Sequence, residues 1–218
     1  IDRAGIVGND GATHHGLLDL AYLRPVPNMQ IAAPMTATDL RQMMTMAVEL
    51  SGPIAIRYPR GRSKDLELPA VEYGKAVCLR DQRSAVGNQP SAIRNRICVL
   101  SIGAIGNTVE EALNSRQELA GVGHYNMRWL KPLDTAAVND VAKRYDTIVT
   151  VEDGMISGGL GSAVLETVDT RQVRVVRLGV DDTFVTHGST AELMHMLHLD
   201  AEGIAESLVQ CLNDQIAK

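Results

Sequence analysis

The sequence predicts an α/β protein in which a mainly parallel sheet is covered by helices on both faces. Short apolar runs alternate with amphipathic helical segments along most of the 218 residues. The runs are apolar throughout rather than alternating, as expected for strands buried on both faces. Apolar residues make up 45% of the chain and charged residues 22%, which is ordinary for a globular protein.

The first part of the chain predicts three short strands and one helix. The strands are expected at residues 4–7 (AGIV), 29–34 (MQIAAP) and 52–61 (GPIAIRYPRG). The helix is expected directly after Thr36, which can cap it, with Asp39 at the third position of a start that resembles a capping box.

Composition changes after the third strand. Residues 62–72 are polar without clear periodicity, and residues 80–96 are charged and interrupted by Gly and Pro, which is typical of an exposed loop or hairpin. We therefore expect a first unit at 1–62, a linker with a loop or hairpin at 63–96, and a second α/β unit at 97–218.

The second unit repeats the α/β pattern more plainly, with strands and helices in strict alternation up to two closing helices. Strands are expected at 97–104, 123–130, 146–153 and 173–180, and helices at 108–119, 135–144, from GGLGSAVLETV onward, at 189–197 and at 201–215.

Composition excludes several classes of function. A net charge of −5 gives no basic surface for nucleic acid, and 3% aromatic residues give few platforms for stacking bases. No apolar run approaches the roughly 20 residues that span a bilayer, so no membrane partner is expected. Three scattered cysteines favour a reducing compartment. The chain opens on IDRAGIVG without Met or a signal-like region, so we expect a piece of a longer or cleaved protein.

The stretch VGNDGATHHG, residues 7–16, is a candidate site. Asp10 can accept hydrogen bonds from hydroxyl groups, His14 can donate, accept or transfer a proton, and the glycines allow a ligand to come close to the backbone. The alternative is a glycine-rich connection with an Asx-turn and a solvent-facing histidine. Adjacent histidines rarely ligate one ion and no partner lies at metal spacing, so zinc is not expected.

Arg3 and Arg60 are the second pair of candidates. Arg3 precedes one expected strand and Arg60 follows another, and ligands collect outside the carboxyl ends of strands in parallel sheets. Arginine binds phosphate through paired, charge-assisted hydrogen bonds. Surface arginines paired with nearby acids are the alternative.

Two glycine-rich segments give weaker signals. EDGMISGGLGS (152–162) resembles a phosphate-binding strand–loop–helix, but it lacks the lysine of a P-loop and the dinucleotide fingerprint. Tight packing of a helix on its strand is the preferred interpretation, and the same holds for SIGAIGN (101–107).

Several long strings resemble one family in order and spacing. DRAGIVGNDGATHHGLLDLAYLRPVPNMQIAAP, GPIAIRYPRG, RWLKPLD, TVEDGMISGGLGSAV and LGVDDTFVTHGS are similar to the 1-deoxy-D-xylulose-5-phosphate synthase family, of the transketolase class of thiamine-diphosphate enzymes. The resemblance covers nearly the whole chain, least at 80–96. It implies the later part of a pyrimidine-binding domain followed by a transketolase-type C-terminal domain.

The resemblance implies an enzyme that condenses pyruvate with D-glyceraldehyde 3-phosphate, releasing carbon dioxide and feeding isoprenoid, thiamine and pyridoxal biosynthesis. It implies thiamine diphosphate and Mg²⁺ as cofactors, a homodimer, and the bacterial cytoplasm or a plastid as location. The N-terminal half of such a protein, with the diphosphate and metal ligands, the activating glutamate and further histidines, is missing here. We therefore expect this chain alone to be inactive.

Residue by residue, the resemblance implies that Asp10 and His14 contact substrate and handle protons, and that Arg3 and Arg60 bind the aldehyde's phosphate. It implies no role for His15, no catalytic role for the C-terminal domain and no confident cofactor ligand. Alternatives are transketolase itself, the β subunit of a 2-oxo acid dehydrogenase, and a non-catalytic assembly or dimerisation module.

Overall fold

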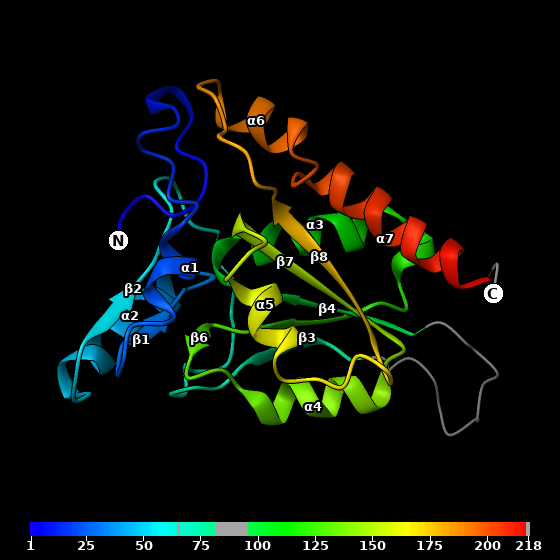
Figure 1. Ribbon diagram of the computed structural model, residues 1–218, viewed down its shortest axis with the longest axis horizontal. Coiled ribbons are helices and arrows are strands. Elements are labelled where there is room, and N and C mark those ends of the chain that lie inside the picture. Colours follow the sequence, from blue (N-terminus) through cyan, green and yellow to red (C-terminus); the bar gives the residue numbers. More distant parts are fainter. Residues whose placement is uncertain (65, 82–95, 217–218) are drawn as a thin grey trace.

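The computed structural model describes residues 1–64, 66–81 and 96–216. The chain forms a five-stranded sheet, order β3-β5-β4-β7-β8, and a three-stranded sheet, order β2-β1-β6 (Figure 1). The strands are β1 Gln30–Ala32, β2 Ile54–Ile56, β3 Val77–Arg80, β4 Ile97–Ser101, β5 Gly123–Asn126, β6 Trp129–Lys131, β7 Thr147–Met155 and β8 Arg174–Val180. The α-helices are α1 Asp19–Leu23, α2 Ala37–Glu49, α3 Gly106–Ser115, α4 Thr135–Arg144, α5 Leu160–Leu165, α6 Thr190–Met196 and α7 Ala201–Ile216.

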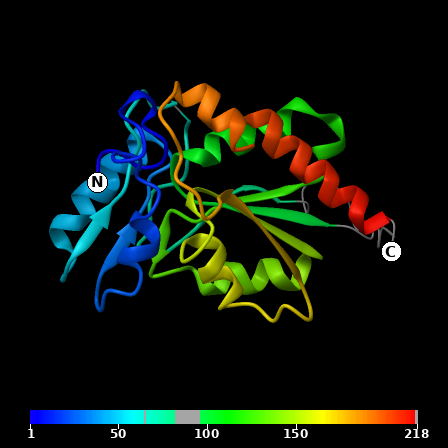
Figure 2. The ribbon, with the colours of Figure 1, turned by 45° about the horizontal axis from the view of Figure 1, so that its top comes forward.

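Helices cover both faces of the five-stranded sheet. Figures 1 and 2 show α3 and α7 on one face and α4 and α5 on the other. β4 pairs in parallel with β5 and β7, and β7 with β8, while β3 is antiparallel at one edge. The predicted α/β class is thus confirmed, with one antiparallel strand added to the sheet.

Alternation along β4 explains how both faces are filled. Ile97 and Val99 pack in the cluster that contains residues of α3 and α7. Cys98 and Leu100 point the other way and pack with residues of α4 and α5. Because successive side chains of a strand point to opposite faces, an uninterrupted apolar run gives two cores.

The smaller sheet joins the two predicted units. β1 pairs in parallel with β2, but its other neighbour is the antiparallel β6, which comes from the second unit. The side chain of Trp129 on β6 is fully buried and packs against Met43 of α2 and Ile56 of β2. The two predicted units therefore share a sheet and a core.

Helix α2 begins as predicted. The Thr36 hydroxyl accepts a hydrogen bond from the backbone N–H of Asp39 at 3.1 Å. The Asp39 carboxylate accepts from the N–H of Met35 at 3.2 Å rather than from that of Thr36. The cap is thus one residue offset from a reciprocal capping box.

Five local features differ from the expectations. In place of the strand expected at 4–7, only Ala4 and Gly5 form isolated bridges, both with Gly16. The strand expected at 123–130 breaks where Arg128 adopts a positive φ of 56°, which sends β6 to the other sheet. The helix expected at 108–119 ends at Ser115 and a 3₁₀ turn follows. β3 lies in the expected linker, and α1 was not expected at all. Most of the loop expected at 80–96 lies outside the described residues.

Candidate active site

The candidate segment 7–16 is a closed loop. At its base Gly5 N–H donates to Gly16 O at 3.0 Å and Gly16 N–H donates to Gly5 O at 2.8 Å. A Cβ on Gly16 would overlap the carbonyl oxygen of Arg3, so this close approach requires glycine. Within the loop, Gly11 N–H donates to Gly8 O, and His14 N–H donates to Gly11 O. The loop is therefore ordered by its own backbone.

Arg3 reaches the site because the first residues run beside the end of β2. Ala4 N–H donates to Tyr58 O, and Tyr58 N–H donates to Ile1 O. This pairing brings Arg3 close to Arg60, 57 positions further along the chain.

The structure brings together three of the four predicted side chains. One Arg3 guanidinium nitrogen lies 3.3 Å from Asp10 Oδ2, and one Arg60 nitrogen lies 3.4 Å from the same oxygen. All three side chains are partly exposed, at 40% for Arg3, 37% for Asp10 and 66% for Arg60. Two arginines thus converge on one oxygen at a solvent-facing site.

The fourth side chain, His14, lies on the same loop but outside this cluster. Its Nδ1 is 2.9 Å from the Thr13 hydroxyl. Among the described residues, nothing is bonded to His14 Nε2, and the side chain is exposed. That nitrogen is free to meet a ligand.

The neighbouring His15 is held by backbone groups. Its Nδ1 accepts from Val7 N–H at 3.1 Å, and its Nε2 lies 3.0 Å from Thr186 O. The family resemblance implied no role for His15, and the local sequence does not indicate these two bonds.

Arg57 and Arg60 flank Tyr58 and Pro59 but have opposite surroundings. Arg57 is 2% exposed and donates to the carboxylates of Asp19 and Asp153 and to Gly16 O. Burial would lower the pKa of Arg57, but Asp153 and Asp19 outweigh it and raise that pKa. The sequence places Arg57 beside Arg60, but no local pattern indicates its buried pairing, because the acidic partners lie 38 and 96 positions away.

The glycine loop at 152–162 is occupied by the chain itself. The Glu152 carboxylate accepts from the N–H groups of Leu160 and Gly161 at 2.8 and 2.9 Å. A Cβ on Gly159 would overlap this carboxylate. Burial raises the pKa of Glu152 to about 7 despite these two bonds. The helix N-terminus that could bind an anion thus already holds an internal carboxyl, which supports the packing interpretation.

A buried Ser–His–Glu row joins β4, β5 and α3. Ser101 Oγ lies 2.7 Å from His124 Nε2, and His124 Nδ1 lies 2.6 Å from Glu110 Oε1. Burial lowers the pKa of His124, whereas bonds from His124 and Arg80 outweigh burial at Glu110 and hold its pKa at about 2. Ser101 and His124 are fully buried, so no substrate reaches them. The row ties the strands together.

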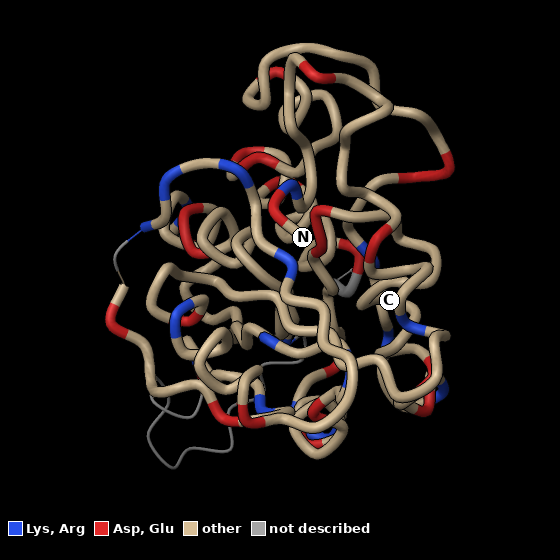
Figure 3. Tube along the Cα trace, turned by 90° about the vertical axis from the view of Figure 1, so that its left-hand side faces the viewer, with Lys and Arg blue, Asp and Glu red and all other residues tan. Residues whose placement is uncertain are grey.

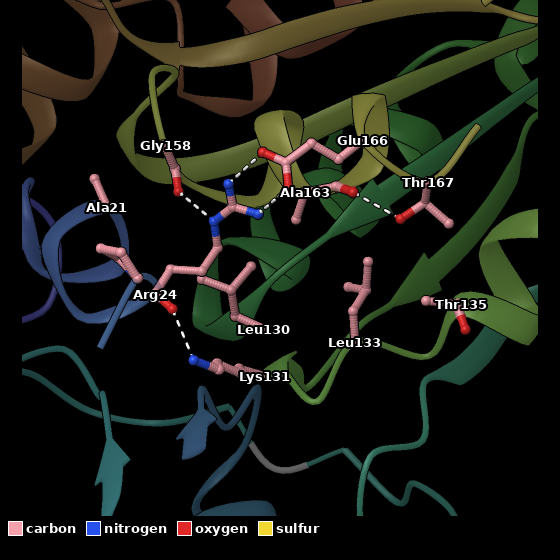
Figure 4. A pocket seen from close by; sticks show the side chains of 11 residues that line it. Ala21, Arg24, Leu130, Lys131, Leu133, Thr135, Gly158, Ala163, Glu166 and Thr167 are labelled. Atoms are coloured by element: carbon pink, nitrogen blue, oxygen red, sulfur yellow. Dashed lines mark hydrogen bonds and ion pairs between the residues drawn. The ribbon is translucent and has the colours of Figure 1, made fainter. Parts of the chain in front are cut away.

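Two hollows flank these elements. One, of about 670 Å³, lies between the start of α2, the loop that follows β2 and the β4–α3 turn, and Arg60 lines it. The other, of about 630 Å³, lies between α1, β6 and α5 (Figure 4). In the second, Arg24 donates to Gly158 O and to both oxygens of Glu166, and Lys131 donates to Arg24 O. Its charged groups are thus engaged by the protein.

Charge around the site is mixed. Seen from the side of the N-terminal part, basic and acidic segments are interspersed along the trace (Figure 3). Among the residues that the structure describes, no group of three or more His, Cys, Asp or Glu side chains could hold a metal ion. No helix in that part of the chain is long and apolar enough to cross a membrane.

Comparisons with known families agree with this architecture. Residues 1–64 match the model of the transketolase pyrimidine binding domain, and residues 92–204 match that of the transketolase C-terminal domain. The chain belongs to the transketolase family.

Within that family, curated relatives are 1-deoxy-D-xylulose-5-phosphate synthases. The Parabacteroides distasonis synthase is 45% identical over 216 residues, 95% of this chain and 32% of its own length. The Aquifex aeolicus synthase is 38% identical over 218 residues, 97% of this chain and 33% of its own length. The chain thus spans about a third of the length of these relatives.

Solved structures show the same fold. A structure titled as a split-gene transketolase, inactive β4 tetramer, is 27% identical with a TM-score of 0.80, and the match covers 98% of this chain and 66% of that one. A transketolase variant from Pichia stipitis is 18% identical with a TM-score of 0.74, covering 97% of this chain and 29% of that one. The second likeness concerns the fold alone.

Proposed function

We propose that this chain supplies the aldehyde-phosphate side of the active site in a transketolase-class transferase. The reaction is that of 1-deoxy-D-xylulose-5-phosphate synthase: pyruvate and D-glyceraldehyde 3-phosphate give 1-deoxy-D-xylulose 5-phosphate and carbon dioxide. The product is an isoprenoid, thiamine and pyridoxal precursor. The identities of 38–45% to curated synthases support this choice within the family.

One observation carries the site assignment. Arg3 and Arg60 come from distant parts of the chain and converge on Asp10 Oδ2. Two guanidinium groups around one acceptor oxygen are arranged as a phosphate group requires, since its oxygens take paired, charge-assisted bonds. Without substrate, the Asp10 carboxylate keeps both arginines at this spacing.

Each residue then has a distinct task. The arginines bind the phosphate at one end of the aldehyde. Asp10 Oδ1, which accepts no hydrogen bond from the described residues, takes a hydroxyl hydrogen of the substrate. His14 Nε2 faces solvent and donates or removes a proton at the oxygen of the reacting carbonyl.

Thiamine diphosphate belongs to the proposal for the complete enzyme, where it would supply carbanion-stabilising chemistry. The described residues do not fit its diphosphate and Mg²⁺, since they offer no metal-ligand cluster. We assign those ligands to the N-terminal half of the enzyme, and the proposed assembly is a cytoplasmic homodimer.

A split enzyme is the second candidate. The solved relative titled as an inactive β4 tetramer of a split-gene transketolase matches 98% of this chain at 27% identity. This match favours an arrangement in which a separate polypeptide supplies the diphosphate-binding half of the enzyme. In both arrangements this chain alone is inactive.

The deciding test is an assay of the natural protein after intact-mass measurement and N-terminal sequencing. Pyruvate, D-glyceraldehyde 3-phosphate, thiamine diphosphate and Mg²⁺ are supplied, and 1-deoxy-D-xylulose 5-phosphate is measured by mass spectrometry. We expect product from a chain about three times this length. Product only from a mixture of two polypeptides would favour the split enzyme, and transketolase activity without this product would overturn the proposal.

A further inference from the structure

We propose that His15 is a positioning residue that fixes the candidate-site loop against the C-terminal part of the chain. The expected effect of His15 on catalysis rests on the proposed function. Its anchoring of the loop can be tested without any activity. His15 belongs to the pair of histidines of which the proposed function uses only His14.

The hydrogen bonds of the His15 ring define its protonation state. A backbone N–H can only donate, so the bond from Val7 N–H means that Nδ1 carries no proton. The proton of the neutral ring is then on Nε2, which donates to Thr186 O at 3.0 Å. His15 thus bonds the start of the loop on one side and a segment 171 positions away on the other.

The segment around Thr186 forms the support on which the loop rests. A Cβ on Gly8 would lie 3.0 Å from Thr190 Oγ1 and 3.2 Å from Gly188 O. A Cβ on Gly11 would lie 3.3 Å from His187 Cβ. These approaches place the loop backbone in contact with residues 186–190.

The two anchors of His15 enclose the proposed substrate contacts. Asp10 and His14 both lie between Val7 and His15, and Gly11 O accepts from the N–H groups of His14 and His15. A change in the ring's position therefore moves the backbone that carries both side chains. Catalytic groups displaced by about 1 Å can lose about a hundredfold in rate.

This gives the C-terminal part a role at the site. Within the described part of the chain, residues 186–190 form no hydrogen bond with the four proposed substrate residues, yet the His15 imidazole links this segment to their loop. The hydrogen bond from His15 Nε2 to Thr186 O is the contact that anchors the loop in this proposal.

Two isosteric variants separate the two bonds of the ring. In His15→Gln, the amide NH₂ lies near the former Nε2 and can still donate to Thr186 O. In His15→Asn, the amide oxygen lies near the former Nδ1 and can still accept from Val7 N–H. His15→Ala removes both bonds, and His195→Ala is the matched control, since that exposed histidine lies near the C-terminal end of α6 and bonds Asp200 rather than the loop.

The first readout is amide exchange of the peptide covering residues 7–16 in this chain, followed from milliseconds to minutes. Losing the bond to Thr186 O, which anchors the loop to the C-terminal part, should speed exchange across this peptide by about threefold to tenfold. We expect this across the peptide in His15→Ala and His15→Asn, which lose the bond to Thr186 O. His15→Gln loses only the bond from Val7 N–H, so its exchange should rise at Val7 alone and stay within about twofold of wild type at residues 8–16, as His195→Ala should throughout. Equal exchange in His15→Ala and wild type would overturn the proposal. If His15→Ala fails to fold, the Asn and Gln variants decide.

The second readout is kinetics of the complete enzyme. We expect His15→Asn to lower kcat/KM for D-glyceraldehyde 3-phosphate by about tenfold or more while the KM for pyruvate stays constant. In His15→Gln, kcat/KM for D-glyceraldehyde 3-phosphate should stay close to that of the wild type. Equal loss in both variants, or no loss in either, would overturn the positioning role. An inactive wild-type enzyme would instead refute the proposed function, and the exchange result would still stand.

Discussion

At the scale of single residues, position in the fold decides what each arginine does. Arg57 and Arg60 are three positions apart, yet Arg57 is buried between two carboxylates and Arg60 is exposed beside Asp10. The Arg57 guanidinium is buried and paired with two carboxylates, so a ligand in solvent does not reach it. In the proposed function, the exposed Arg60 exchanges its single 3.4 Å contact with Asp10 for contacts with a phosphate at little cost.

Arg60→Ala in the complete enzyme should raise the KM for D-glyceraldehyde 3-phosphate by about tenfold to a hundredfold. A lost hydrogen bond to a charged group costs roughly 1.5–3 kcal/mol, and 1.4 kcal/mol is a factor of ten. Steady-state kinetics with each substrate varied in turn checks this. The KM for pyruvate should not change. Arg41→Ala, an exposed arginine on α2 bonded to Thr38, is the control, and an equal effect from it would contradict the phosphate role.

Glu152→Gln should change how stability depends on pH. The pKa of Glu152 is about 7 in the folded state against 4.5 as its ordinary value. Between these values the unfolded state has lost a proton that the folded state retains, so this group costs stability as pH rises from about 5 to above 7. The variant lacks that cost, which amounts to about 3 kcal/mol.

Urea denaturation of wild type and Glu152→Gln at pH 5 and pH 8 provides the measurement. The free energy of unfolding of the variant, minus that of the wild type, should be larger at pH 8 than at pH 5. A difference that stays constant with pH would show that Glu152 is ionised in the folded protein throughout this range.

At the scale of elements, the start of α2 is tied to the turn that opens β6. Arg128, 2% exposed, donates through two nitrogens to the Asp39 carboxylate at 3.2 and 2.8 Å. Its positive φ of 56° turns the chain from the larger sheet to the smaller one. The ion pair thus holds the crossover that joins the two sheets.

Asp39→Ala should lower the free energy of unfolding by about 3–5 kcal/mol, because it leaves the Arg128 guanidinium buried without a counter-charge. Chemical denaturation of this chain measures the effect. Adding Arg128→Met should recover part of the loss, since the double variant leaves no buried charge. Losses that simply add would mean that the two side chains do not act as a pair.

At the scale of the whole molecule, Arg57 connects segments from three regions of the chain. It bonds Asp19 at the start of α1, Asp153 on β7 and Gly16 O at the base of the candidate loop. The candidate loop therefore rests on the same buried charge cluster that joins the two parts. We expect the parts to unfold together.

Arg57→Met should destabilise the chain by about 3–5 kcal/mol near neutral pH, since two carboxylates would remain buried and unpaired. The loss should shrink as pH falls, because burial raises the pKa of Asp19 and its protonated form needs no counter-charge. The comparison is Arg24→Met, which breaks a pair with Glu166 whose side chain is 64% exposed and should cost about 1 kcal/mol or less. Equal losses for the two variants would contradict a central role for Arg57.

The sequence by itself determined the α/β class, the main strands and helices of the second part, the cap of α2 and the identity of the candidate residues. These follow from periodicity, side-chain type and local hydrogen bonding, which act over a few residues. The motif strings also indicated the family, because long unusual strings occur in one order.

Only the tertiary structure decided which residues meet. Arg3 and Arg60 both contact Asp10, and Arg57 is buried beside Asp19. His15 lies within hydrogen-bond distance of Thr186 O. The Glu152 carboxylate accepts a hydrogen bond within the glycine loop that follows it. At Arg128 the chain passes from β5 in the larger sheet to β6 in the smaller one. Each of these contacts joins residues whose pairing depends on burial and on the path of the whole chain, and no local pattern encodes that path.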